Sequence, residues 1–242
     1  MTVVITGANS DIGKAVTNVY LHGNEDIYLL DHGNQYEALA EKYRNYENVT
    51  VYSLDLNDDQ EVDGFKQVIH SEFKEIDILI NIAGINILKS FLDLDRETLD
   101  KVIRINATNT LIFTQSVIPK MISRGGAHII FIGSQHGVVA NYDRVPYSIS
   151  KSILIHMTKS LALELSHFNI KVNCVSPTFV LTETNQELLH SPMFQINALH
   201  EIPLEEYVAP EEVADAAAFL TSEKNKSITG HNLLIDGGWT IK

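Results

Sequence analysis

The chain alternates short apolar runs with segments of helical periodicity over almost its whole length. Seven apolar runs have the length of a strand, and they lie at residues 2–6, 26–30, 49–54, 76–80, 128–132, 171–176 and 232–236. Helical patterns begin near Ile12 and then cover about 36–43, 58–73, 96–122, 145–165 and 210–220. Continuous apolar runs are typical of parallel strands that are buried on both faces. The alternation therefore predicts an α/β fold with a doubly wound, parallel, seven-stranded sheet.

One domain is expected to span residues 1–242. A length of 242 residues suits a single large α/β domain, and 45% of the residues are hydrophobic. No proline-rich linker, low-complexity tract or repeat divides the chain. The alternation lapses at about 182–208, where short helical patterns and prolines mix with polar residues. Because this segment follows the carboxyl end of a strand, we expect it to cover a substrate as a lid.

The charge balance limits the partners and the compartment. With 31 acidic and 18 basic side chains the net charge is −13, which leaves no basic patch for nucleic acid or for an anionic membrane surface. No apolar run approaches the roughly 20 residues that a membrane-spanning helix needs, and the amino terminus lacks the layout of a signal peptide. We therefore expect a cytoplasmic protein that acts on a small-molecule substrate.

Histidine and cysteine patterns argue against two kinds of chemistry. The ten histidines include no H-x-x-x-H or H-x-H pair with acidic partners, so no metal site is predicted. The single cysteine, Cys174, excludes an internal disulfide. It lies in an apolar run without an adjacent basic residue, so we expect a buried, inert thiol.

Polar residues and glycines gather at the carboxyl ends of the predicted strands. In doubly wound sheets, ligands bind outside those ends at the point where the strand order reverses. The residues found there are Gly7, Asp31, Asp55, Asn81, Ser134 and Pro177. One ligand site can therefore be assembled from motifs that are spread over most of the sequence.

The first strand ends in a glycine-containing turn, T-G-A-N-S-D-I-G, at 6–13. Backbone N–H groups at the start of the following helix can face a pyrophosphate, and the helix dipole favours its negative charge. Asp31, at the end of the second strand, is placed to accept hydrogen bonds from ribose hydroxyls and to repel a 2′-phosphate. This indicates NAD rather than NADP. The alternative is that Asp31 only forms the turn D-H-G-N.

Tyr147 and Lys151 lie four residues apart in the helical pattern at 145–165. Positions i and i+4 share one face of a helix, so the phenol and the ammonium can converge on one small volume. A nearby cation favours the charged form of a phenol, which makes the pair a candidate proton donor and acceptor. Taken alone, Y-x-x-x-K is too common to be specific. Asn106 is also unusual, because asparagine is a poor former of helix interiors and it stands inside the 96–122 pattern.

Taken together, these motifs resemble the short-chain dehydrogenase/reductase family over residues 2–239. The shared motifs are T-G-x-x-x-G-x-G at Thr6–Gly13, N-N-A-G at Asn81–Gly84 and Y-x-x-x-K at Tyr147–Lys151. The family's serine appears as Ser134, thirteen residues before the tyrosine, and its mid-helix asparagine as Asn106. The resemblance implies a Rossmann-type fold. It also implies a catalytic set consisting of Asn106, Ser134, Tyr147 and Lys151.

The resemblance implies a role for each member of this set. Tyr147 would exchange a proton with the substrate oxygen, and Ser134 would hydrogen-bond that oxygen. Lys151 would favour the phenolate and hold the nicotinamide ribose, while Asn106 would position a water that links Lys151 to solvent. The nicotinamide would exchange a hydride with the substrate carbon. The expected reaction interconverts a secondary alcohol and a ketone.

Cofactor contacts are carried over in the same way. They are Gly7, Asn9, Ser10, Asp11, Ile12, Gly13, Asp31, Asp55, Leu56, Asn81, Ala83, Gly84, Tyr147, Lys151, Pro177, Val180 and Thr182. Three positions depart from the family pattern: Asp11 replaces the second glycine of the turn, Ile82 the second asparagine of N-N-A-G, and Thr178 a glycine. The Asp11 carboxylate would lie near the pyrophosphate, or would turn away and favour the helix amino terminus. Ser10 stands where NADP-preferring members often carry a basic residue, which agrees with NAD.

Within the family, the chain resembles 3-hydroxybutyrate dehydrogenases most. S-Q-H-G at 134–137 is similar to their S-A-H-G, and Arg144 stands where they carry a lysine. The resemblance implies substrate contacts at Asn86, Ser134, His136, Arg144, Tyr147 and Gln186. Because a guanidinium can bind a carboxylate with two hydrogen bonds, a short hydroxy acid is the expected substrate. Alternatively, His136, Arg144 and Gln186 are ordinary polar loop residues.

Two other functions remain open. A 3-oxoacyl carrier-protein reductase would share the fold and the catalytic set, but it would use NADPH and dock an acidic carrier protein, which Asp31 and the acidic charge both disfavour. A catalytically silent sensor of the dinucleotide is the other alternative, and Asp11 is the feature that favours it. The family resemblance also implies a homotetramer.

Overall fold

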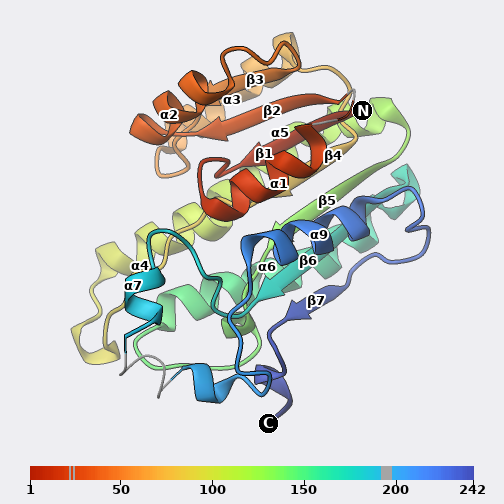
Figure 1. Cartoon of the computed structure of the whole chain (residues 1–242). Helices are drawn as coiled ribbons and strands as arrows, with labels where there is room; N and C mark the ends of the chain where they lie inside the picture. Colours follow the sequence, from red (N-terminus) through yellow and green to blue (C-terminus); the bar gives the residue numbers. More distant parts are fainter. Residues whose placement is uncertain (22, 24, 192–197) are drawn as a thin grey trace.

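The computed structural model describes residues 1–21, 23, 25–191 and 198–242, and it confirms the α/β fold (Figure 1). Seven parallel strands form one sheet in the order β3-β2-β1-β4-β5-β6-β7. The strands are β1 (Thr2–Thr6), β2 (Asp26–Asp31), β3 (Val49–Ser53), β4 (Ile78–Asn81), β5 (Ala127–Ile132), β6 (Ile170–Pro177) and β7 (Asn232–Ile235). Each strand begins within two residues of the predicted run.

Helices cover both faces of the sheet (Figure 1). They are α1 (Asp11–Leu21), α2 (Gly33–Tyr43), α3 (Asp59–Glu72), α4 (Arg96–Ile103), α5 (Asn109–Arg124), α6 (Val145–Leu165), α7 (Gln186–Leu189) and α9 (Pro210–Thr221). One apolar cluster joins α3, α5 and α6 to the sheet, and a second joins α1, α2 and α9 to it. Neighbouring strand residues such as Val3 and Val4 belong to different clusters, as expected for a sheet that is buried on both faces. Cys174 is buried in β6 as predicted, and this burial raises the pKa of its thiol.

Several helix ends follow from single residues. The Asp58 side chain accepts hydrogen bonds from two backbone N–H groups in the first turn of α3, and Asp95 accepts one in the first turn of α4. Such contacts satisfy N–H groups that have no partner within the helix. Pro210 opens α9, and Gly125, with φ of 81°, ends α5 in a left-handed conformation.

The predicted helix at 96–122 is divided in the structure. Between α4 and α5, residues 104–108 form a π-helical turn, in which the N–H of Asn109 bonds the carbonyl oxygen of Arg104, five residues earlier. The Thr110 hydroxyl donates to the carbonyl oxygen of Ile105 at 2.9 Å. The wider turn accommodates Asn106, whose side chain is fully buried. The predicted helical span is therefore present, and the π-turn lies at the asparagine that the sequence marked as unusual.

The strand order reverses between β1 and β4, and the ends of these two strands are in direct backbone contact. Gly7 adopts φ of 65°, and a Cβ atom on it would lie 2.7 Å from the backbone nitrogen of Ala83. The Thr6 hydroxyl accepts a hydrogen bond from the N–H of Ile82 at 3.2 Å. A residue without a side chain is needed at position 7 for the two strand ends to approach this closely.

The segment after β6 holds short elements, among them α7 and a 3₁₀ turn at Leu199–Glu201. Its two ends are joined where the N–H of Leu181 donates to the carbonyl oxygen of Val208 at 2.8 Å. Residues 192–197, in the middle of the predicted lid at 182–208, lie outside the described residues, and the lid stays a prediction. No helix in the described part of the chain combines the length and the apolar character that crossing a membrane requires.

The contact at Gly7 predicts a loss of stability on substitution. Gly7→Ala should lower the free energy of unfolding by about 1–3 kcal/mol, because alanine is strained at a positive φ and its methyl group meets Ala83. Urea unfolding measures this change. Gly64→Ala is the matched control, since nothing lies within 4 Å of a Cβ atom at this position in α3 and alanine favours a helix interior. Equal urea midpoints for Gly7→Ala and the unaltered protein would contradict the packing described here.

Candidate active site

Two adjoining cavities lie at the carboxyl ends of the strands, where the strand order reverses. The first, which we call the loop cavity, has a volume of about 410 Å³ and is lined by the turn after β1 and by residues after β2 and β3. The second, the tyrosine cavity, has a volume of about 290 Å³ and is lined by residues after β5 and β6 and by the start of α6. The residues that line both are Ser10, Ile82, Gly84, Ile85 and Thr182. The two cavities are therefore parts of one cleft.

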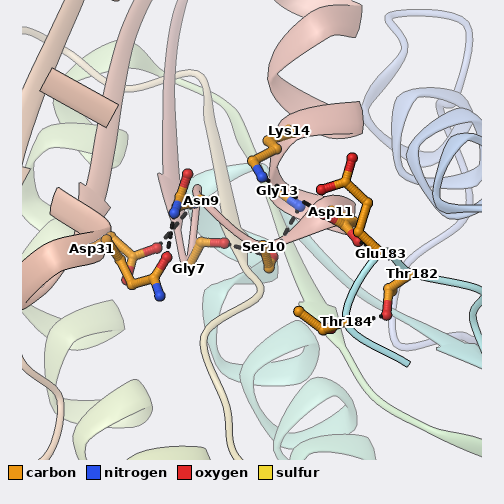
Figure 2. Close-up of polar contacts among 11 residues, drawn as sticks. Gly7, Asn9, Ser10, Asp11, Gly13, Lys14, Asp31, Thr182, Glu183 and Thr184 are labelled. Carbon is orange, nitrogen blue, oxygen red and sulfur yellow. Dashed lines mark hydrogen bonds and ion pairs between the residues drawn. The ribbon is translucent and has the colours of Figure 1, made fainter. Parts of the chain in front are cut away.

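The turn after β1 is folded tightly on itself (Figure 2). The Ser10 hydroxyl donates to the carbonyl oxygen of Gly7 at 2.7 Å and accepts from the N–H of Gly13 at 3.1 Å. A Cβ atom on Gly13 would lie 2.4 Å from the carbonyl oxygen of Gly7, so the helix start packs directly against the turn. This cradle at the amino end of α1 fits the pyrophosphate of a dinucleotide.

Asp31 lies at the end of β2 and lines the loop cavity, together with Asp55 and Leu56. Its Oδ2 accepts the N–H of Asn9 at 2.9 Å, and its Oδ1 accepts the N–H of His32 at 3.0 Å. The Asn9 side chain in turn contacts the amide of Gln35. A carboxylate has about four acceptor sites, so Asp31 can shape the turn and still accept hydrogen bonds from a ligand in the cavity.

Asp11 is the first residue of α1, and its side chain is directed toward the segment after β6 (Figure 2). Its Oδ2 accepts the backbone N–H of Glu183 at 2.7 Å. Its Oδ1 lies 3.7 Å from the Lys14 ammonium nitrogen. Of the two orientations expected from the sequence, the carboxylate adopts the one with a protein partner, at a helix end where negative charge is favourable.

Lys151 and Tyr147 come from one face of α6 and line the tyrosine cavity. The Lys151 ammonium is buried, donates to the carbonyl oxygen of Ile132 at 2.7 Å, and lies 5.6 Å from the centre of the Tyr147 ring. The Ser134 hydroxyl accepts the N–H of His136 at 3.1 Å and lines the same cavity. The structure therefore brings a phenol, an ammonium and a hydroxyl to one small volume.

The π-helical turn holds the Asn106 amide behind this cavity. Its Oδ1 accepts the N–H of Ile85 at 2.8 Å, and its Nδ2 donates to the carbonyl oxygen of Ile85 at 2.8 Å and to the Ser150 hydroxyl at 3.0 Å. A Cβ atom on Gly84 would lie 3.2 Å from Asn106 Oδ1 and 3.6 Å from the Lys151 nitrogen. Asn106 thus fixes the backbone that separates it from Lys151.

His136 and Arg144 add polar groups to the tyrosine cavity, and Asn86 also lines it. Burial, and next the charge of Arg144, lower the pKa of His136 to about 4, so this imidazole is neutral near pH 7. Burial also lowers the pKa of the Arg144 guanidinium, whose Cζ lies 5.6 Å from the centre of the Phe179 ring. Among the described residues that line this cavity, Arg144 and Lys151 are cationic and none carries a carboxylate.

Two aromatic residues near the cavity were not predicted from the sequence. Phe179 and Trp239 lie with their ring centres 5.6 Å apart, and the His136 ring is 5.9 Å from the first and 6.3 Å from the second. Phe179 also lines the tyrosine cavity. Its position two residues after the end of β6 was a signal available in the sequence. Trp239, close to the end of the chain, gave no such local signal.

Four predicted site residues do not line either cavity, and one of them is Asn106, which lies behind the tyrosine cavity. Gln186 is exposed at the start of α7, and Gly13 packs within the turn. Asn81 is buried, and its Nδ2 donates to the Thr114 hydroxyl at 3.2 Å. The other cofactor positions line the cleft: Pro177, Val180 and Ile12 face the tyrosine cavity, while Ala83 faces the loop cavity. Within the described parts of the chain, no three His, Cys, Asp or Glu side chains are grouped so that they could hold a metal ion.

Comparison with known proteins agrees with this geometry. The family model described as Enoyl-(Acyl carrier protein) reductase matches residues 7–240. An NAD-dependent glycerol dehydrogenase from Listeria innocua is 34% identical over 239 residues, which cover 99% of this chain and 93% of the relative.

The similar solved structures include some with a bound dinucleotide. A 4-hydroxyisoleucine dehydrogenase complexed with NADH has a TM-score of 0.93 and 29% identity, and the match covers 100% of this chain and 99% of the other. ElxO with NADP bound has a TM-score of 0.90 and 28% identity, with the same coverage. The chain belongs to the short-chain dehydrogenase/reductase family, and it is an oxidoreductase of the kind that acts on alcohol and ketone groups.

Proposed function

We propose that this protein is an NAD-dependent oxidoreductase whose substrate is a short hydroxy acid. It oxidises the secondary alcohol of this acid to a ketone, or catalyses the reverse reduction. The observation that carries the proposal is the charge of the tyrosine cavity, where the described lining includes the Arg144 guanidinium and the Lys151 ammonium but no carboxylate. Lys151 is engaged by the carbonyl oxygen of Ile132. The partly buried Arg144 is then the group suited to bind a substrate carboxylate through paired hydrogen bonds.

The chemistry divides between the chain and the cofactor. When bound, the nicotinamide supplies the site that accepts or donates a hydride. Tyr147 takes the proton of the substrate hydroxyl during oxidation and returns it during reduction, and the Lys151 ammonium nitrogen lies 5.6 Å from the centre of its ring. The Ser134 hydroxyl donates to the substrate oxygen, which stabilises negative charge as it develops there. Neutral His136 offers a hydrogen bond without adding charge to the cavity.

NAD is the proposed cofactor because of Asp31. Its carboxylate lines the loop cavity beside Asn9, where it can bind ribose hydroxyls and repels a 2′-phosphate. The glycerol dehydrogenase relative is described as NAD-dependent and one solved relative carries NADH, whereas ElxO carries NADP. The relatives therefore do not decide between NAD and NADP, and the proposal of NAD depends on Asp31.

A neutral polyol is the second candidate substrate, since the Listeria innocua relative is a glycerol dehydrogenase. The hydroxy acid has its own support among the relatives, because 4-hydroxyisoleucine is itself a hydroxy acid. The homotetramer and the cytoplasmic location stay predictions. Light scattering on the purified protein tests the first of these.

The substrate proposal is tested by turnover with NAD over a panel of hydroxy acids, including 3-hydroxybutyrate, and of neutral polyols, including glycerol. We expect Arg144→Ala to raise KM for acids roughly 10- to 100-fold, because a hydrogen-bonded charge pair is lost. Arg144→Lys should retain part of the affinity, and Arg96→Ala, at an exposed position in α4, is the control. Faster turnover of polyols than of acids, with no effect of Arg144→Ala, would make the protein a polyol dehydrogenase.

The role of the phenol is tested with the best substrate of that panel. Tyr147→Phe should lower kcat by roughly 100- to 10,000-fold, the range that general acid–base catalysis contributes. Isothermal titration should show that the variant still binds NAD. Tyr142→Phe removes the same hydroxyl from a side chain that is 92% exposed and should not change kcat. Unchanged turnover in Tyr147→Phe would exclude the proposed proton transfer.

Cofactor choice is tested by titrating NAD and NADP into the protein. We expect NAD to bind roughly 10-fold tighter or more, because like charges at close range disfavour the 2′-phosphate complex by more than about 1.4 kcal/mol. Asp31→Asn should narrow this difference, and Asp55→Asn, which removes a carboxylate from another part of the loop cavity, should leave it unchanged. Tighter binding of NADP by the unaltered protein would overturn the choice of NAD.

A further inference from the structure

A side-chain contact joins the turn after β1 to the segment after β6 (Figure 2). Asp11 stands where the family motif has a glycine, and its Oδ2 accepts the Glu183 N–H at 2.7 Å. The two residues are 172 positions apart in the sequence. The Asp11 side chain is 18% exposed, and its hydrogen bond to Glu183 lies at the surface of the protein. A glycine in this position would leave the N–H of Glu183 without this acceptor.

The segment 182–185 lies along the boundary between the two cavities. Thr182 lines both of them, Glu183 and Thr184 line the loop cavity, and Asn185 lines the tyrosine cavity. Bonds within the segment fix its shape: Asn185 Oδ1 accepts the N–H of Thr182 at 2.8 Å, and Asn185 Nδ2 donates to the carbonyl oxygen of Val180 at 2.9 Å. The bond to Asp11 fixes where this preformed turn sits relative to the glycine turn.

We propose that Asp11 is a positioning residue that holds the segment 182–185 against the glycine turn before a dinucleotide binds. The functional meaning of this contact depends on the dinucleotide binding proposed above, whereas the contact itself does not. Because the segment is already in place, dinucleotide binding does not have to include the free-energy cost of ordering it. Asp11 therefore makes a contact that the family's glycine, which has no side chain, could not make.

Lys14 allows a carboxylate to act as a positioning residue in an anion-binding site. Its ammonium nitrogen lies 3.7 Å from Asp11 Oδ1, and its side chain also lines the loop cavity. A carboxylate beside a pyrophosphate would weaken binding by like-charge repulsion. The adjacent ammonium offsets that charge, and the hydrogen bond to Glu183 directs the carboxylate toward the protein.

Hydrogen exchange in the dinucleotide-free protein tests the contact itself. We expect Asp11→Gly to speed exchange of the Glu183 amide roughly 10- to 100-fold, the change that corresponds to losing a hydrogen bond to a charged group. Asp11→Asn keeps an acceptor oxygen and should restore most of the protection. Glu183→Ala removes an exposed side chain but not the N–H, so its exchange should match that of the unaltered protein. Equal exchange in Asp11→Gly, Asp11→Asn and the unaltered protein would overturn the proposal.

Calorimetric titration of NAD into Asp11→Gly and Asp11→Asn tests the consequence for binding. Both variants lack the charge, so a difference between their affinities for NAD reports the hydrogen bond to Glu183. We expect roughly 3- to 10-fold weaker binding in Asp11→Gly than in Asp11→Asn, equivalent to about 0.7–1.4 kcal/mol. Equal affinities would overturn the positioning role. If the exchange result holds and none of the proteins binds NAD, the proposed function fails while Asp11 still positions the segment.

Discussion

The backbone contact between the ends of β1 and β4 is the constraint on which the site depends. A parallel sheet whose order reverses must open a crevice at that point, because the connections leave toward opposite edges. Gly7 lets the two strand ends touch there, and it lines the loop cavity beside them. The residues concerned are those of the glycine turn, Asp31, Tyr147 and Lys151. They lie near this point because the carboxyl ends of the strands face the same cleft.

The π-helical turn is the second device that shapes the site. A regular helix through 96–124 would present its buried residues in a continuous stripe, whereas the wider turn inserts a polar amide between apolar layers. Asn106 uses that amide to bond both backbone groups of Ile85. The backbone after β4 is thereby fixed beside Lys151, so the irregular turn between α4 and α5 helps to fix the shape of the tyrosine cavity.

The sheet and the placement of Tyr147 beside Lys151 were predictable because each depends on local sequence. Apolar runs of strand length located all seven strands, and the i, i+4 spacing located Tyr147 and Lys151 on one helix face. The π-turn was not predictable, since apolar periodicity is nearly the same whether the helix is regular or locally widened. The orientation of Asp11 depends on a hydrogen-bond donor far along the chain, and the aromatic group around His136 depends on Trp239. Both features depend on tertiary contacts, which local sequence does not predict.

Charge is divided between the two halves of the cleft. The loop cavity is lined by the carboxylates of Asp11, Asp31, Asp55 and Glu183 with one lysine, Lys14, while the described lining of the tyrosine cavity carries cations and no carboxylate. An anionic substrate is therefore attracted to one half and repelled from the other. The same division bears on the dinucleotide, since its pyrophosphate must be held by backbone N–H groups and the helix dipole rather than by excess positive charge. In a chain with a net charge of −13, local backbone donors and two cations in the tyrosine cavity decide where an anion can bind.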